Sequence, residues 1–222
     1  MNISLKTKIY NQILDDIIQG VYPLDMFLNE GELIKRFNVS KGPVREALIE
    51  LCNENILRSI PRVGYQIVQL TEKNVREATE LRLLLEITGL RKAIPLLNNE
   101  MLDRLSCLNN EYDSKMKSGT LTIDQHWEYN NCFHLTLNSF AGNSYMNEIL
   151  CDTLKLIRRA YVQLYSNIRH NTYISTDIHR HMDMEKGLRE KDTDRVLKLL
   201  KSDIVFIKGS LYVTSEEFYD IL

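Results

Sequence analysis

Residues 29–68 of the 222-residue chain read NEGELIKRFNVSKGPVREALIELCNENILRSIPRVGYQIV, and this stretch decides the fold. Asn29 is typical of a helix N-cap, and the segment Glu30–Phe37 behind it carries a short apolar face. After a two-residue break, Ser40 suits the N-cap of a second helix, whose first turn tolerates Pro43. Two short helices joined by such a tight break predict a helix-turn-helix.

The same stretch ends in the pattern of a β-hairpin. Two β-prone runs, Ile56–Ile60 and Tyr65–Val68, flank the turn residues Pro61-Arg62-Val63-Gly64. Upstream, Leu5–Gln19 has isoleucines four residues apart, which indicates an amphipathic helix that Gly20 ends. Three short helices and a hairpin make a winged helix-turn-helix, which we expect in residues 1–69.

The remaining residues, 70–222, show helical periodicity and no strand pattern. Breaks at proline, glycine and asparagine residues divide this part into six predicted helices. Their expected bounds are Thr71–Leu97, Asn99–Ser118, Thr122–Phe140, Ser144–Ser166, Tyr173–Lys191 and Thr193–Val213. Short connections favour antiparallel neighbours. The predicted fold class is therefore mainly α, an N-terminal winged helix-turn-helix followed by an antiparallel all-α helical bundle.

Composition narrows the class of protein. The formal net charge of -2 means that any affinity for nucleic acid must come from a local cluster of cations. Four cysteines lie far apart without a CxxC pair, which fits reduced thiols in a cytosol. No signal peptide and no run of the ~18 apolar residues that a membrane span needs is visible. We expect a cytoplasmic protein without a membrane partner, and the absence of HExxH, nucleophile-elbow and phosphate-loop motifs predicts no enzyme.

A local excess of positive charge surrounds the predicted second helix of the helix-turn-helix. From residue 35 to residue 62 there are six cations, Lys35, Arg36, Lys41, Arg45, Arg58 and Arg62, against three anions, Glu46, Glu50 and Glu54. In a helix-turn-helix this second helix enters the major groove of DNA, while a wing can reach the minor groove. We therefore expect double-stranded DNA as a partner. The predicted DNA-binding residues are Arg36, Ser40, Lys41, Gly42, Pro43, Arg45, Arg62 and Gly64.

For charge alone, an ordinary solvated helix face is the alternative interpretation of Lys41 and Arg45. The hairpin favours DNA binding, because a purely structural turn has no need of Arg62 at its tip. Residues 29–68 also resemble the GntR-type winged helix-turn-helix signature, most specifically at Val39-Ser40 and Pro43–Leu48. Two positions depart from that signature. Gly31 stands where many members carry a basic residue, and Asn55 stands where glycine is usual at a helix end.

The helical remainder resembles the FadR-like C-terminal ligand-binding domain of that family, called FCD. The resemblance is carried by Arg82 and Glu86 in ELRLLLE, by Phe133-His134 and Gly142-Asn143 in NNCFHLTLNSFAGN, and by His181 eleven residues before Asp192. It implies a homodimer that binds a palindromic operator and responds to a small organic-acid effector. The predicted function is thus a ligand-responsive transcription regulator, either a repressor or an activator.

Many FCD domains hold a divalent metal with one aspartate and three histidines. The resemblance places the ligands of this chain at Asn130, His134, His181 and Asp203. Asn130 and His134 lie four residues apart and so share one face of a helix. Asn130 replaces the usual aspartate and Asp203 the usual last histidine, so the carboxylate moves to the opposite side and the set keeps one negative charge. Zn²⁺, Mn²⁺ or Ni²⁺ would accept such donors.

The residues leave a metal-free interpretation open. His134 and His181 are then satisfied polar residues of a bundle interior, or they bind an anionic effector directly. Arg82 is predicted to help bind the effector, because its planar guanidinium suits a carboxylate, although an ion pair with Glu86 explains it equally well. The alternative function is a constitutive DNA-binding dimer whose helical domain has lost sensing. The other three histidines, His126, His170 and His179, have no motif support and are interpreted as surface or ordinary helix residues.

Overall fold

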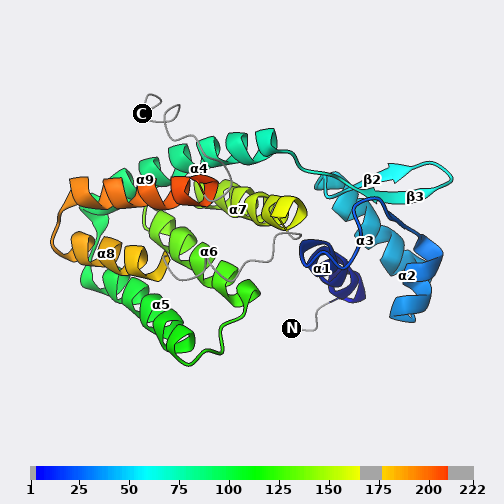
Figure 1. Cartoon of the computed structure of the whole chain (residues 1–222), viewed down its shortest axis with the longest axis horizontal. Coiled ribbons are helices and arrows are strands. Elements are labelled where there is room, and N and C mark those ends of the chain that lie inside the picture. Colours follow the sequence, from blue (N-terminus) through cyan, green and yellow to red (C-terminus); the bar gives the residue numbers. More distant parts are fainter. Residues whose placement is uncertain (1–3, 166–176, 210–222) are drawn as a thin grey trace. The chain divides into compact units, whose positions relative to one another are not determined.

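The computed structural model describes residues 4–165 and 177–209, and the chain divides into two compact units. The first unit comprises residues 1–71 and 158–168, and the second comprises residues 72–157 and 169–222. Figure 1 labels helices α1 to α9 and the strands β2 and β3. All four cysteines are free thiols. Within the described ranges, no helix has the length and apolar character that crossing a membrane demands.

Three helices form most of the first unit. Helix α1 spans Leu5–Ile18, α2 spans Glu30–Phe37 and α3 spans Lys41–Asn53. The side chain of Asn29 accepts a hydrogen bond from the backbone N–H of Gly31, so it caps α2 as predicted. Ser40 is the N-cap of α3 by position, but its side chain makes no capping hydrogen bond.

A small antiparallel sheet completes the first unit. Strands β2 (Leu57–Ile60) and β3 (Gly64–Ile67) form the predicted hairpin, and β1 (Phe27–Leu28) adds an edge in the order β1-β3-β2. The sequence did not predict β1, because two residues are too few to show an alternating pattern. Gly64 has a φ of +143°, and a Cβ atom there would lie 2.6 Å from the backbone oxygen of Leu28. The hairpin therefore needs glycine where β1 closes against it.

The first unit has its own apolar core, to which α1, α3 and the sheet all contribute. Its fully buried members include Ile13 of α1 and Val44, Leu48 and Leu51 of α3. These positions on α3 follow the helical period, so one face of α3 is buried and the other stays in solvent. Burial of each such side chain stabilises the fold by about 1.5–3 kcal/mol. The core thus holds α3 with a defined face outward.

Within the described residues, all regular secondary structure of the second unit is helical. Its elements are α4 (Glu72–Ala93), the 3₁₀ turn η1 (Ile94–Leu96), α5 (Asn99–Lys117), α6 (Ile123–Ser139), α7 (Ser144–Tyr165), α8 (Asp177–Arg189) and α9 (Thr193–Gly209). The end of α7, from residue 158 on, belongs to the first unit. The first predicted helix of this part ran on to Leu97, whereas the α-helix ends at Ala93. Pro95 explains the difference, because it cannot donate a helical hydrogen bond. The predicted helix start at Tyr173 and the predicted end at Val213 lie outside the described residues.

Helices α4, α5, α6, α8 and α9 of the second unit pack around one core. Helix α4 contacts α6 and α9, α5 contacts α6 and α8, and α8 contacts α9. Leu90, Leu105, Phe133 and Leu200, one from each of α4, α5, α6 and α9, lie in the centre of this core. The predicted fold class, a winged helix-turn-helix followed by a helical bundle, is confirmed.

One close contact fixes how α4 lies against α6. Gly89 of α4 faces Asn138 of α6, and a Cβ atom on Gly89 would lie only 1.9 Å from the side-chain oxygen of Asn138. The missing side chain therefore lets the two helices approach closely. Glu86 lies about one turn before Gly89, and His134 lies about one turn before Asn138. The same approach brings Glu86 and His134 together.

Candidate functional site

The outward face of α3 carries several of the predicted DNA-binding residues. Lys41, Gly42 and Arg45 are exposed on α3. Arg45 makes no hydrogen bond or ion pair with any residue in the ranges 4–165 and 177–209, so its guanidinium is available to a ligand. Lys41 lies 3.5 Å from a carboxylate oxygen of Glu30. A Cβ atom on Gly42 would meet nothing within 4 Å, so this part of the surface is open.

Arg36, also predicted to bind DNA, is engaged within the first unit. Its guanidinium lies 2.6 Å from the buried carboxylate of Asp16 in α1, donates to the hydroxyl of Tyr22 and lies 5.3 Å from the ring centre of Phe37. The hydrogen bond to Asp16 raises the pKa of Arg36 above its ordinary value. These contacts join α2 to α1, so Arg36 has a structural role whatever else it does.

The wing places its arginine at the tip of the hairpin. Arg62 is exposed and has a φ of +66°, a left-handed conformation that costs about 1 kcal/mol or more for a residue with a side chain. Arg58 of β2 donates to the side chain of Gln66 in β3. Arg62, by contrast, has no ion pair with another residue of the described chain. Of the predicted DNA-binding residues, Arg45 and Arg62 are therefore exposed and have no ion pair in the described chain. Gly64 is explained by its close approach to the backbone of Leu28.

A chain of buried charged side chains runs through the second unit. Arg82 donates to Glu86 across one turn of α4 at 2.5 Å. The other oxygen of Glu86 lies 2.6 Å from Nδ1 of His134 on α6. Nε2 of His134 lies 3.0 Å from Oδ2 of Asp203 on α9, and Nε2 of His181 on α8 lies 3.8 Å from the same oxygen. Each of the five side chains is buried.

Attraction between neighbours favours the charged forms of three of these groups, His134, Asp203 and Glu86, against the effect of burial. Burial alone lowers the pKa of His134, but the carboxylates of Glu86 and Asp203 outweigh it, and the pKa of His134 is raised. Burial alone raises the pKa of Asp203, but the close approach of His134 and His181 holds that pKa well below its ordinary value. The pKa of Glu86 is lowered, against burial, by Arg82 and His134. The cluster therefore balances cations with carboxylates.

Three of the four predicted metal ligands present a buried atom without a hydrogen-bond partner in the described chain. These atoms are Oδ1 of Asn130, Nε2 of His134 and Oδ2 of Asp203. The last two are at ion-pair distance, but their directions do not form a hydrogen bond. Buried polar atoms of folded proteins are normally satisfied, so three such atoms in one predicted set need a reason.

The donor set fits a divalent metal ion. Ligand atoms of His134, His181 and Asp203 all lie within 4.8 Å of one another. Ligands at about 2.1 Å from a tetrahedral Zn²⁺ lie about 3.4 Å from each other, which falls between the observed separations of 3.0 and 3.8 Å. Two imidazoles, one carboxylate and one amide oxygen are donors that Zn²⁺, Mn²⁺ or Ni²⁺ accept.

Neighbouring side chains orient the three strongest donors. The carboxylate of Glu86 on Nδ1 of His134 leaves Nε2 to face Asp203. The ring of Phe133 stacks on the ring of His181 at 3.9 Å between centres and 5° between planes. Arg180 lies 3.3 Å from the other carboxylate oxygen, Oδ1, of Asp203. The donors therefore do not depend on a metal for their orientation.

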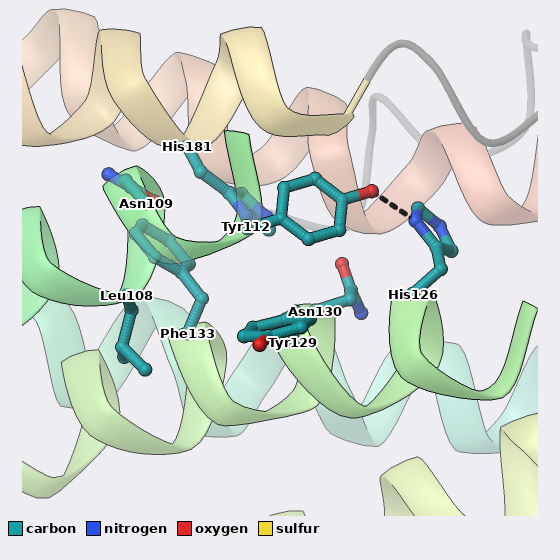
Figure 2. Close-up of a pocket in the computed structure, with 8 residues that line it drawn as sticks. All are labelled: Leu108, Asn109, Tyr112, His126, Tyr129, Asn130, Phe133 and His181. Atoms are coloured by element: carbon teal, nitrogen blue, oxygen red, sulfur yellow. Dashed lines mark hydrogen bonds between the residues drawn. The ribbon is translucent and has the colours of Figure 1, made fainter. Parts of the chain in front are cut away.

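A small cavity opens beside this set, between α5, α6 and α8 (Figure 2). Its volume is about 10 Å³, which is about the room that one water molecule needs. Figure 2 shows Asn130 and His181 on its wall, and the hydroxyl of Tyr112 bonded to Nδ1 of His126 at one end. The lining residues are Leu108, Asn109, Tyr112, His126, Tyr129, Asn130, Phe133 and His181. A ligand in this cavity would thus meet the predicted metal ligands directly.

The sequence missed Tyr112 and His126 and left the place of Arg82 open. His126 was interpreted as a surface or ordinary helix residue, but it is buried and lines the cavity. No motif joins it to Tyr112, and the helical period of α5, which puts Tyr112 on a buried face, was the only available signal. Arg82 is 1% exposed, pairs with Glu86 and is not among the lining residues of this cavity. His170 lies outside the described residues.

A larger hollow of about 510 Å³ lies elsewhere in the second unit, between η1, the start of α5 and the turn from α8 to α9. Arg189 and Lys191 are its cationic lining residues. Arg189 is bound to Asp103 and Glu185, so its charge is already balanced. None of the predicted ligand residues lines this hollow.

Two family models match the chain. The model described as bacterial regulatory proteins, gntR family, matches residues 5–67. The FCD domain model matches residues 77–205, more than half of the chain. This chain belongs to the gntR family of bacterial regulatory proteins and carries an FCD domain. The prediction of a DNA-binding transcription regulator, rather than an enzyme, is therefore confirmed.

Relatives of this gntR-family regulator span nearly its whole length. It is 28% identical over 204 residues to the HTH-type transcriptional regulator YdhC of Bacillus subtilis, which covers 91% of this chain and 90% of YdhC. It is 27% identical over 199 residues to the gluconate operon transcriptional repressor of Bacillus licheniformis, covering 88% of this chain and 80% of the relative. Among solved structures, Escherichia coli McbR/YncC has a TM-score of 0.74 at 18% identity, covering 95% of this chain and all of that one. This last likeness concerns the fold.

Proposed function

We propose that this chain is a ligand-responsive transcriptional repressor that binds a palindromic operator as a homodimer and senses a small organic acid at a buried metal site. The observation that carries the sensing part is the set of three buried atoms without hydrogen-bond partners, on Asn130, His134 and Asp203. Repression is supported by the name of the Bacillus licheniformis relative, a repressor of the gluconate operon. Gluconate is itself an organic acid.

DNA reading is assigned to α3 and the wing. Arg45 is suited to donate two hydrogen bonds to a guanine in the major groove, because it is exposed and uncommitted. Lys41 and the wing residue Arg62 contribute phosphate or minor-groove contacts. One recognition helix makes few base contacts, so useful specificity requires a second copy on the other half of a palindrome. This is the physical reason for proposing a homodimer.

Asn130, His134, His181 and Asp203 would hold the metal. A divalent ion there would supply positive charge and an open coordination position for a carboxylate oxygen. The residues of the chain do the positioning, since Glu86 fixes the orientation of His134 and Phe133 that of His181.

The size of the cavity links binding to a change of shape. A space of about 10 Å³ admits one water-sized group, whereas even a small organic acid has several heavy atoms. Binding therefore requires the aromatic wall formed by Tyr112 and Tyr129 to move. An effector that favours the opened wall shifts the population of conformations, and this is how it alters the spacing of two recognition helices on the operator.

The metal content of the purified protein tests the sensing site. We expect near one equivalent of Zn²⁺, Mn²⁺ or Ni²⁺ by inductively coupled plasma mass spectrometry after chelation and re-supply of each metal. His134→Ala should lose most of this metal, because it removes a central donor. His179→Ala is the matched control, since His179 is exposed on α8 and lies outside the donor set. It should keep the metal.

No metal under any supply would reject the metal site and leave the alternative of a DNA-binding dimer without a metal-based sensor. Equal loss in His134→Ala and His179→Ala would also reject the proposed donors. The homodimer is tested separately by sedimentation equilibrium of the full chain. A monomer that binds a single half-site as tightly as the full palindrome would contradict the proposed operator symmetry.

A further inference from the structure

One large aliphatic side chain of α3 points away from the core of the first unit. Ile49 is 47% exposed, whereas Val44, Leu48 and Leu51 of the same helix are fully buried. Exposing a β-branched aliphatic side chain gains nothing for the fold, because its apolar area stays in water. Ile49 therefore stands out as an apolar group on the surface assigned to DNA reading.

The helical period places Ile49 on the same side of α3 as the uncommitted arginine. Ile49 follows Arg45 by four residues and Gly42 by seven, and positions at these spacings share a helix face. Glu50, which flanks this face, is occupied by an ion pair of 2.6 Å with Lys6 of α1. Together Gly42, Arg45 and Ile49 form a strip with no side chain at its start, a cation in the middle and an apolar group at its end.

Duplex DNA offers one apolar feature in its major groove, the C5-methyl group of thymine. Isoleucine has one dominant side-chain rotamer in a helix, so it presents a fixed apolar surface without a large loss of entropy on binding. The charged phosphates of the backbone give such a side chain no partner. We infer that Ile49 is a specificity-determining residue, which contacts a thymine methyl group beside the base pair that Arg45 reads.

The geometry of the helix sets where this thymine lies. Four residues of an α-helix span about 6 Å along its axis. Base pairs repeat every ~3.4 Å along the duplex. A helix that lies along the groove therefore places Ile49 one or two base pairs from the base contacted by Arg45. The inference rests on the proposed reading of DNA by α3.

The test removes only the methyl group. The full chain is used to select binding sites from a random pool of duplex DNA, and Arg45→Ala identifies the base pair in the selected site that depends on that arginine. Each thymine within three base pairs is then replaced singly by deoxyuridine, which has the same hydrogen-bonding groups and lacks the methyl. Dissociation constants are measured by fluorescence anisotropy for the wild type, for Ile49→Ala and for the control Leu84→Ala. Leu84 is an exposed aliphatic residue of α4, in the second unit.

For the wild type we expect one deoxyuridine in a half-site to weaken binding about fourfold, the effect of removing one buried methyl-sized group. Ile49→Ala should bind the thymine and deoxyuridine sites equally, while Leu84→Ala should keep the fourfold difference. The inference is overturned if no thymine near the Arg45 base pair is sensitive, or if Ile49→Ala keeps the full difference. If Arg45→Ala leaves the selected sequence unchanged, the proposed reading face itself is wrong, and that result is distinct from a failure of Ile49 alone.

Discussion

The two units of this regulator build their candidate sites in opposite ways. The strip proposed to read DNA, formed by Gly42, Arg45 and Ile49 of the first unit, is exposed on one helix, and Arg45 at its centre has no ion pair within the described chain. The predicted metal ligands of the second unit and their partners Arg82 and Glu86 are buried side chains from four helices. Glu86 and His134 each have two ion-pair partners. The first site can change its residues without disturbing the fold. In the second, stability and recognition depend on the same atoms.

The largest effect should come from a buried charge. Glu86→Ala removes the partner of both Arg82 and His134 and leaves two buried cationic groups without it. Breaking a buried pair in this way costs about 3–5 kcal/mol of unfolding free energy. Urea denaturation followed by circular dichroism measures the loss. If the unfolding free energy changed by less than about 0.5 kcal/mol, the buried cluster would not stabilise the second unit, and the contrast with the exposed site of the first unit would be wrong.

The corresponding experiment on the first unit changes the exposed Arg45. Arg45→Ala should weaken specific operator binding by about 100-fold, a loss of about 2.7 kcal/mol, because it removes a bidentate contact to a base. Its unfolding free energy should stay within about 0.5 kcal/mol of wild type, as for other surface positions. Arg91→Ala, an exposed arginine of α4, serves as control for DNA affinity. Loss of both stability and affinity in Arg45→Ala would mean that the strip is part of the fold after all.

A smaller effect is expected where α4 meets α6. Gly89→Ala places a methyl group against the buried side chain of Asn138, and overpacking of this kind costs about 1–3 kcal/mol. The double variant Gly89→Ala/Asn138→Ala should recover part of the loss, because it removes the obstructing amide. Urea denaturation of both variants, with Asn138→Ala alone as reference, completes the cycle. If the losses of unfolding free energy in the two single variants simply add up in the double variant, this contact does not determine how α4 packs against α6.

The smallest expected effect is a pH dependence of the metal-free protein. The pKa of His134 is raised on folding, so its ion pairs stabilise the fold at acidic pH, and this contribution is lost as the pH rises above about 6.5 and through the raised pKa. The lowered pKa of Asp203 contributes stability above about pH 4 that is lost as the pH falls. Chelator-treated protein should therefore be most stable between these limits. His134→Gln should flatten the alkaline side, and an unchanged slope in that variant would contradict the assignment.

The contrast between the units also explains which features the sequence could predict. The bounds of α2 and the place of Asn29 follow from local chemistry, and they were predicted correctly. Strand β1 was missed because its only signal is a pairing with β3, almost forty residues away in sequence. In the same way, the charge of Arg36 suits a DNA contact, but its pairing with Asp16 depends on how α1 and α2 pack.

In the second unit, the sequence suggested the ligand residues only through a family resemblance. The spacing of Asn130 and His134 places them on one helix face, but no local pattern brings His181 and Asp203 to them. The replaced donors also made the chemistry ambiguous. What the structure adds is the burial of all four side chains and the cavity beside them. Residues that meet only through packing, such as Tyr112 and His126, leave no mark in a sequence taken alone.

The contact between Gly89 and Asn138 tightly constrains the interface of α4 and α6 in the second unit, in contrast to the cavity wall that α5 supplies. Since α4 and α6 meet there with no spare room, a slide of one helix along the other would pull the carboxylate of Glu86 off its histidine. Substitutions that change the choice of effector are therefore poorly tolerated at the interface of α4 and α6. Helix α5 supplies Leu108, Asn109 and Tyr112 to the opposite wall of the cavity, and none of them belongs to the donor set. Diversification of this regulator toward new signals should accordingly accumulate on α5.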